Sequence, residues 1–201
     1  MQNSKKKMNL ANNITLSRIV LAGIFMFLLF CQGVLSRYLA LFTFVLAALT
    51  DFFDGRIARR RNLENDFGRL MDPIADKILI LAAFLAFVEM KIIPAWMVIV
   101  IIFRELLITG LRINAVRSHG RVLSASLAGK HKTVSQMAAV LAILIFLIVK
   151  ESARQVWNPI WELWFKRGVF YLMLWTVALT LISGISYIMK YKERLFPGRK
   201  S

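Results

Sequence analysis

The 201-residue chain is both very apolar and strongly basic. Hydrophobic residues make up 58% of it, and 27 lysines and arginines against 11 acids give a formal net charge of +16. This composition excludes intrinsic disorder, which needs few apolar residues, and argues against a soluble globule, in which about 45–50% of residues are apolar. The single cysteine, Cys31, excludes an internal disulfide framework.

The lengths of the uncharged runs predict a membrane protein. A helix needs about 20 mainly apolar residues to cross a bilayer, and residues 19–36, 133–149 and 168–189 are uncharged. Three further spans must include charged residues inside the membrane or at its edge, and such charges by default suggest a functional site. Lysine and arginine at an edge could instead extend to the interface, which short aspartate side chains do less well. We therefore expect an all-α integral membrane protein with a single domain, 1–201. It has an interfacial amphipathic segment, 1–17, and six transmembrane helices at 18–36, 38–58, 72–91, 94–115, 132–150 and 168–190.

The distribution of basic residues predicts the orientation of these spans. Six spans place both termini on one side, and 21 of the 27 lysines and arginines fall on that side. The other six lie near Arg37, near Lys91 and in the loop from Lys150 to Arg167. Because basic residues are retained on the cytoplasmic side, where the lipids are anionic, both termini are expected in the cytoplasm of a cell-membrane (inner-membrane) protein. No basic domain remains outside the membrane, so nucleic acid is not an expected partner.

Two pairs of aspartates lie at the predicted cytoplasmic ends of the second and third spans. Asp51 and Asp54 are three residues apart and share a helix face. Asp72 and Asp76 are four residues apart, and Asp72 followed by proline is typical of a helix start. The chain reverses between the pairs, over residues 59–68, so the pairs can face each other.

Four carboxylates at a similar depth repel one another and require a compensating cation. Carboxylate oxygens without thiolates or imidazoles suit Mg²⁺ or Mn²⁺. The simpler alternative is that Asp72 caps a helix and Asp51 pairs with a nearby arginine. That alternative leaves an acidic pair in an apolar span unexplained.

Small residues and one arginine accompany the acidic pairs. Gly55 and Ala58 lie one turn apart, and Gly68 precedes the third span. They allow close approach of a flat ligand or, equally, of a packed helix. Arg59 is placed to meet phosphate oxygens at the membrane surface.

The pattern D-x2-D-G-x2-A-R-x8-G-x3-D-x3-D, over residues 51–76, matches every fixed position in the signature of the CDP-alcohol phosphatidyltransferase family. The chain therefore resembles that family. Residues 9–18, 104–112 and 127–133 also resemble segments of its bacterial phosphatidylglycerophosphate synthase branch. One departure is Ala11, where proline is expected, and it affects only the entry to the first helix.

The resemblance implies an activity and a set of site residues. Such enzymes transfer the phosphatidyl group of CDP-diacylglycerol to an alcohol, here sn-glycerol 3-phosphate, and release CMP. It further implies a homodimer. Because the aspartates lie at the predicted cytoplasmic ends of their spans, the active site is expected to face the cytoplasm. Two divalent cations, Mg²⁺ or Mn²⁺, would be held by Asp51, Asp54, Asp72 and Asp76. Asp76 would also act as the general base. The CDP pocket would include Gly55, Ala58, Arg59, Gly68, Asn65, Asn12 and Thr15.

A second basic group indicates how the acceptor is bound. The cytoplasmic ends of the fourth and fifth spans carry Arg104, Arg112, Lys130 and Lys132. An acceptor that bears a phosphate would need such cations, although they could instead be topology anchors. Arg104 must lie within a span, where Glu105 can pair with a neighbouring cation. The alternatives are a same-family enzyme using serine, an inositol compound or phosphatidylglycerol, and a divalent-cation transporter, whose site tends to lie nearer the midplane.

Overall fold

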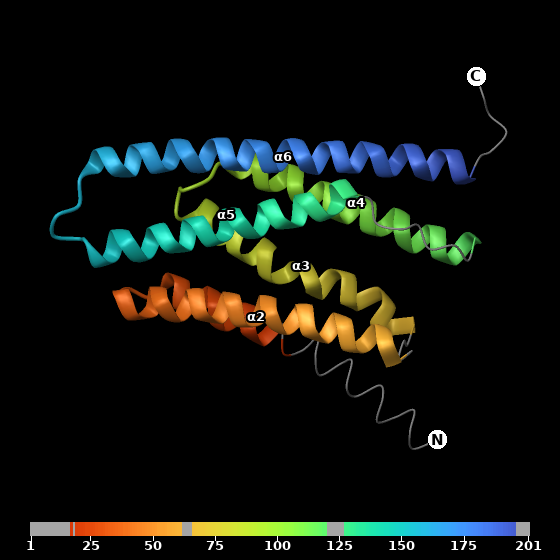
Figure 1. The fold of residues 1–201 in the computed structure, drawn as a ribbon, viewed down its shortest axis with the longest axis horizontal. Coiled ribbons are helices and arrows are strands. Elements are labelled where there is room, and N and C mark those ends of the chain that lie inside the picture. Colours follow the sequence, from red (N-terminus) through yellow and green to blue (C-terminus); the bar gives the residue numbers. More distant parts are fainter. Residues whose placement is uncertain (1–16, 18, 62–65, 120–126, 196–201) are drawn as a thin grey trace, which may run out of the picture. The chain divides into compact units, whose positions relative to one another are not determined.

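The computed structural model describes residues 17, 19–61, 66–119 and 127–195, and side chains for 17, 19–50, 77–111 and 131–189. The described chain is helical between short connections, without a strand (Figure 1). Its helices are Ile19–Phe30, α2 (Val34–Arg61), α3 (Asp66–Glu89), α4 (Ala95–His119), α5 (Leu127–Ser152) and α6 (Pro159–Leu195). The all-α prediction is confirmed.

The uncharged run predicted as one span, 18–36, is divided in two. Its helix ends at Phe30, and α2 begins at Val34. The break follows from Gly33, whose φ of 110° lies in the left-handed region that only glycine adopts readily. Carbonyls left open near the end of the first helix accept hydrogen bonds from α2. Ser36 Oγ donates to the carbonyls of Leu28, at 3.2 Å, and Cys31, at 3.0 Å.

The helix start predicted at Asp72 is wrong, because α3 begins at Asp66. In general, an acidic residue in the first turn favours a helix start, because the helix dipole is positive at that end. The sequence has such a residue at Asp66, ahead of Asp72. Pro73 therefore lies at the eighth position of α3 rather than in its first turn. The helix continues through it, although a proline there removes one backbone hydrogen bond.

The last helix also begins earlier than predicted. The expected span was 168–190 after a loop from Lys150 to Arg167, but α5 continues to Ser152 and α6 begins at Pro159. Proline is favoured in the first turn of a helix. Glu162 and Lys166 pair at 3.0 Å with i,i+4 spacing, so these charged residues extend the helix instead of ending it.

The helices form two compact units. The first comprises Met1–Ala86 and Leu141–Asn158, and the second comprises Phe87–Val140 and Pro159–Ser201. In the first, Phe25 and Phe44 are fully buried and their ring centroids lie 5.7 Å apart. In the second, α4 packs against α6, and its core includes Met97, Ile101 and Met173.

Many large apolar side chains are exposed among the described residues, and several buried ones are polar. Phe27, Phe103 and Trp175 are each more than 60% exposed, among many other large apolar side chains. The buried polar and charged residues are Thr43, Glu105, Lys132, Gln136, Thr176, Thr180 and Ser183. Within the described part of the chain, two helices, His131–Ser152 and Pro159–Met189, are long and apolar enough to cross a membrane. An apolar exterior around a partly polar interior is the arrangement of a membrane protein.

Candidate active site

The two aspartate pairs lie at matching positions on α2 and α3. Asp54 and Asp51 are seven and ten residues before the last residue of α2, while Asp72 and Asp76 are six and ten residues after the first residue of α3. At 1.5 Å per residue, all four lie about 9–15 Å along their helices from the connection between them. Only residues 62–65 join the two helices, so the helix ends are at most about 18 Å apart. This register supports the prediction that the pairs sit at one level.

The donor set fits a hard divalent cation. The segment 51–76 offers carboxylates but no cysteine or histidine, and oxygen-only donor sets suit Mg²⁺ and Mn²⁺. The side chains of this segment lie outside the described part of the structure. The same holds for the other predicted residues Asn12, Thr15, Gly55, Ala58, Arg59, Asn65, Gly68, Arg112 and Lys130.

Two of the predicted acceptor-binding cations meet at a buried carboxylate in the second unit. Glu105, on α4, accepts a hydrogen bond from Nζ of Lys132, on α5. Its Oε1 also lies 3.3 Å from NH1 of Arg104. The three side chains are between 4% and 11% exposed, so the ions are largely withdrawn from solvent. The predicted pairing of Glu105 with a neighbouring cation is confirmed.

α6 contributes the groups that fix the arginine. Ser183 Oγ accepts a 2.8 Å hydrogen bond from NH2 of Arg104. The neighbouring position is Gly184, where an added Cβ would lie 3.3 Å from Cγ and 3.4 Å from Nε of the same arginine. The absence of a side chain at this glycine therefore lets the arginine lie against α6 and reach the serine.

A row of buried polar residues continues along α6 from this contact. Thr176 and Thr180 are fully buried, but each hydroxyl donates to a carbonyl four residues earlier, at 2.9 and 2.6 Å. On α5, Gln136 lies one turn after Lys132, is 5% exposed, and its Nε2 has no hydrogen-bond partner within the described residues. This amide is therefore a donor that a polar ligand could use.

Sequence reasoning did not identify Ser183, Gly184 or Gln136 as site residues. A signal for the first of these exists in the last uncharged run, where Thr176, Thr180 and Ser183 recur at helical spacing. A polar stripe of this kind in an apolar helix indicates a face turned towards protein rather than lipid.

The three charged side chains together carry one formal positive charge. In a site of low dielectric constant, such a group attracts an anion more strongly than it would in water. Arg112 lies seven residues after Glu105 on α4, two turns further along the same helix face. The arrangement therefore suits an anionic group such as a phosphate.

Comparison with known proteins identifies the family. The model of the CDP-alcohol phosphatidyltransferase family matches residues 8–183. The chain belongs to the CDP-alcohol phosphatidyltransferase family. This family uses divalent metal ions, and the match covers both aspartate pairs and the Glu105 cluster.

Curated relatives of this CDP-alcohol phosphatidyltransferase match along nearly all of the chain. A protein from Bacillus subtilis named CDP-diacylglycerol–glycerol-3-phosphate 3-phosphatidyltransferase is 38% identical over 199 residues, covering 93% of this chain and 97% of its own length. A protein of the same name from Rickettsia bellii is 33% identical, covering 92% and 96%. A probable phosphatidylglycerophosphate synthase from Mycobacterium tuberculosis is 34% identical, covering 90% and 81%.

Proposed function

We propose that this enzyme transfers the phosphatidyl group from CDP-diacylglycerol to sn-glycerol 3-phosphate, giving phosphatidylglycerophosphate and CMP. The observation that carries the proposal is the near full-length similarity to relatives named for this reaction. The chemistry of the residues agrees with it. Carboxylates at one end of α2 and α3 suit a metal-bound diphosphate, and the Glu105 cluster supplies cations suited to a second phosphate.

The aspartates hold the metal in this proposal. Asp51, Asp54, Asp72 and Asp76 bind two Mg²⁺ or Mn²⁺ ions through their carboxylate oxygens. Such ions, when bound, polarise the phosphoryl oxygens and stabilise the charge of the departing CMP. The matching helix positions of the two pairs support a shared site.

Asp76 is the proposed general base. It takes the proton from the acceptor hydroxyl, whose oxygen then bonds to the phosphorus of the phosphatidyl group. The bond from that phosphorus to the oxygen of CMP breaks, and CMP leaves with the electron pair. A base has to reach the proton that it removes, and Asp76 follows Asp72 by one helical turn.

The cytidine and acceptor sites use the remaining predicted residues. Gly55, Ala58 and Gly68 leave room for the nucleotide, and Arg59 contacts its phosphates. Further contacts to CDP come from Asn12, Thr15 and Asn65. The phosphate of glycerol 3-phosphate is held by Arg104, Arg112, Lys130 and Lys132. The buried contacts of Glu105 support this assignment, because they hold two of these cations in fixed positions.

The proposed enzyme has six transmembrane helices, both termini in the cytoplasm and an active site facing the cytoplasm, and it acts as a homodimer. The excess of basic residues at one set of helix ends supports this orientation. The aspartates then lie at the cytoplasmic ends of their helices, where the soluble acceptor can reach them. This position distinguishes the enzyme from a cation transporter, whose ion site tends to lie near the bilayer midplane.

The proposal is tested by measuring CMP release from CDP-diacylglycerol by the purified protein with a panel of acceptors. Glycerol 3-phosphate should be the best of them, and glycerol should be very poor, since it lacks the phosphate. A preference for serine, an inositol compound or phosphatidylglycerol would refute the acceptor assignment and leave the transferase chemistry intact. Metal uptake into vesicles without any CMP release would instead favour the transporter.

A further inference from the structure

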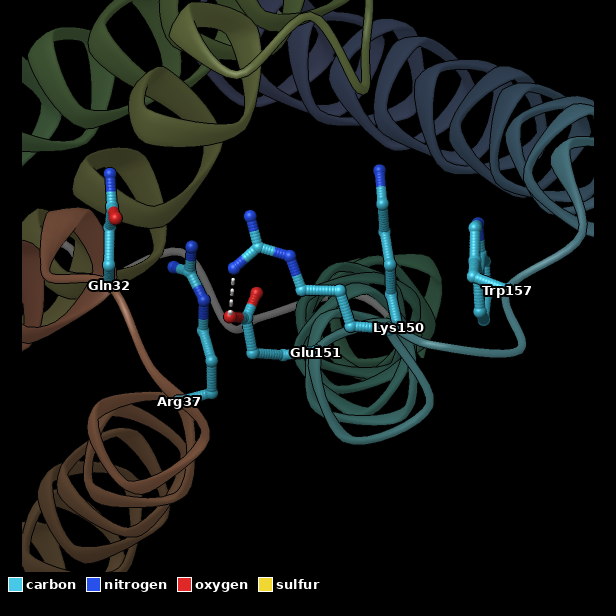
Figure 2. Close-up of a pocket in the computed structure, with 6 residues that line it drawn as sticks. Gln32, Arg37, Lys150, Glu151 and Trp157 are labelled. Atoms are coloured by element: carbon cyan, nitrogen blue, oxygen red, sulfur yellow. Dashed lines mark ion pairs between the residues drawn. The ribbon is translucent and has the colours of Figure 1, made fainter.

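A basic pocket lies within the first unit, at the opposite end of α2 from the aspartates. It encloses about 350 Å³, within the roughly 300–1,000 Å³ range of small-ligand pockets. Figure 2 shows Gln32 and Arg37 on one side and Lys150 on the other, with Glu151 between Arg37 and Lys150. The full lining is Gln32, Arg37, Lys150, Glu151, Arg154 and Trp157.

The pocket is separate from the proposed catalytic site. Arg37 precedes Asp51 by 14 residues on the continuous helix α2. At 1.5 Å per residue, their Cα atoms lie about 21 Å apart along the axis. Gln32 lies in the connection before α2, and the other lining residues come from the end of α5 and the connection after it. All of these residues belong to the same unit. No role in the transfer reaction uses these residues.

Arg37 contacts a backbone carbonyl and has a second donor without a partner among the described residues. Its NH1 donates to the carbonyl of Leu29, at the end of the first helix, which fixes the guanidinium beside the break between the two helices. Its Nε is buried and has no hydrogen-bond partner within the described residues. Donors that stay unsatisfied in a buried position are rare, and a bound polar ligand is one way to satisfy them.

The charge of the lining favours an anion. Three cations, Arg37, Lys150 and Arg154, face one acid, Glu151. That acid lies 3.7 Å from the guanidinium of Arg154, whose side chain is 80% exposed, so solvent screens this pair. The lining therefore has a formal charge of +2. Arginine and lysine donors in this setting suit the oxygens of a phosphate.

The residues beside the pocket lining in the chain suit a lipid headgroup with its acyl chains. Leu35, Val149 and Val156 are at least half exposed beside the lining residues in the chain, and they present apolar surface on which acyl chains can lie. Trp157 belongs to the lining itself, and tryptophan favours the boundary between acyl chains and headgroups. A soluble anion would make no use of the apolar flanks.

We propose that this pocket binds the phosphate of an anionic phospholipid, at the end of α2 opposite the aspartates. Arg37 and Lys150 contact the phosphate oxygens, and the acyl chains lie on the exposed apolar side chains beside them. The site would hold a structural or regulatory lipid, in addition to the lipid substrate.

The test is native mass spectrometry of the purified, detergent-solubilised full chain titrated with phosphatidylglycerol. Lys150→Gln and Arg37→Gln remove one cation each. The matched control is Arg167→Gln, which removes an exposed arginine that lies over the Trp164 ring, 5.7 Å from its centroid, outside the pocket. Parallel titrations use phosphatidylcholine, which is zwitterionic, and inorganic phosphate. CMP release by each variant reports whether the fold is intact.

Loss of one charge-assisted contact should weaken phosphatidylglycerol binding at least about tenfold in Lys150→Gln, while Arg167→Gln binds like the wild type. Arg37→Gln should behave in the same way. If Arg37→Gln fails to fold because the contact with Leu29 is lost, phosphatidylglycerol binding by Lys150→Gln still tests the proposal. Equal binding by Lys150→Gln and the wild type would overturn the proposal. An effect on inorganic phosphate alone would also overturn it, because the site would then take a soluble anion. Neither outcome depends on the identity of the acceptor.

Discussion

Replacing Glu105 with glutamine should destabilise the protein substantially. The carboxylate accepts a hydrogen bond from Lys132 and lies beside Arg104, and all three side chains are nearly withdrawn from solvent. Glutamine keeps the shape and one carbonyl oxygen but removes the negative charge. The two cations would then face each other in the interior without a counter-ion, which is the costly way to break a buried ion pair.

The magnitude follows from the geometry. Two unit charges 3.3 Å apart attract by about 5 kcal/mol at an effective dielectric constant of 20. Removing one partner of a buried pair typically costs about 3–5 kcal/mol. Because glutamine still accepts one hydrogen bond, we expect the lower limit of about 3 kcal/mol. For a chain of this length that corresponds to a fall in melting temperature of about 6–12 °C.

A second substitution separates stability from acceptor binding. In Glu105→Gln with Lys132→Met, one of the two cations is gone and their mutual repulsion with it, so part of the melting temperature should return. Acceptor binding should not return, because the ammonium proposed to contact the phosphate is absent. Circular dichroism during heating in detergent measures the first quantity, and the KM for glycerol 3-phosphate in the CMP-release assay measures the second.

Two results would refute the reasoning. A melting temperature of Glu105→Gln within about 2 °C of the wild type would show that the ion pair carries little energy. Recovery of both stability and acceptor KM in the double variant would show that Lys132 only balances charge in the interior.

Three further predictions concern the rest of the site. Asparagine at any of the four aspartates should remove most turnover without unfolding the protein, and EDTA should abolish activity until Mg²⁺ or Mn²⁺ is restored; activity that survives thorough chelation would count against the metal site. Gly184→Ala should displace Arg104, because the new methyl group would lie 3.3 Å from its Cγ, and should raise the KM for glycerol 3-phosphate severalfold. The control is Gly168→Ala, on the same helix with open space around it, and it should leave the KM for glycerol 3-phosphate unchanged. Arg112→Ala should raise the acceptor KM about tenfold or more and leave the KM for CDP-diacylglycerol nearly unchanged; equal changes in both would contradict an acceptor contact.

Much of the helical framework could be predicted from the chain. Uncharged runs of span length and short apolar runs bounded by charge located α4 and α5 closely. The errors lie where one local interaction decides a boundary. Gly33 divides an uncharged run because its backbone adopts φ of 110°, which hydropathy does not register. Pro159 and the ion pair of Glu162 with Lys166 begin a helix inside a charged segment that reads as a loop.

The features of the candidate site that depend on residue type and spacing could be predicted from the sequence. A carboxylate and an arginine inside an apolar helix require partners, because burying an unpaired charge costs much free energy. The pairing of Glu105 with a cation could therefore be predicted. The hydrogen bond between Ser183 and Arg104 could not be predicted in this way, because the two residues are 79 positions apart in the chain. That contact depends on how α4 packs against α6, and on Gly184 allowing the approach.

The positions of the proposed acceptor-binding cations around their helices predict which substitutions should raise the KM for glycerol 3-phosphate most. Positions 130 and 132 of α5 are two residues apart, which at 3.6 residues per turn separates them by about 160° around the axis. Lys132 is turned towards Glu105, so position 130 lies on nearly the opposite side of the helix. On α4, in contrast, position 112 shares the face of Glu105. A phosphate held at the Glu105 cluster therefore depends more on Arg112 and Lys132 than on Lys130. Lys130→Ala should still raise the KM for glycerol 3-phosphate, but less than Arg112→Ala or Lys132→Met. The reverse order in the same titration would place the phosphate on the other side of α5, away from Glu105.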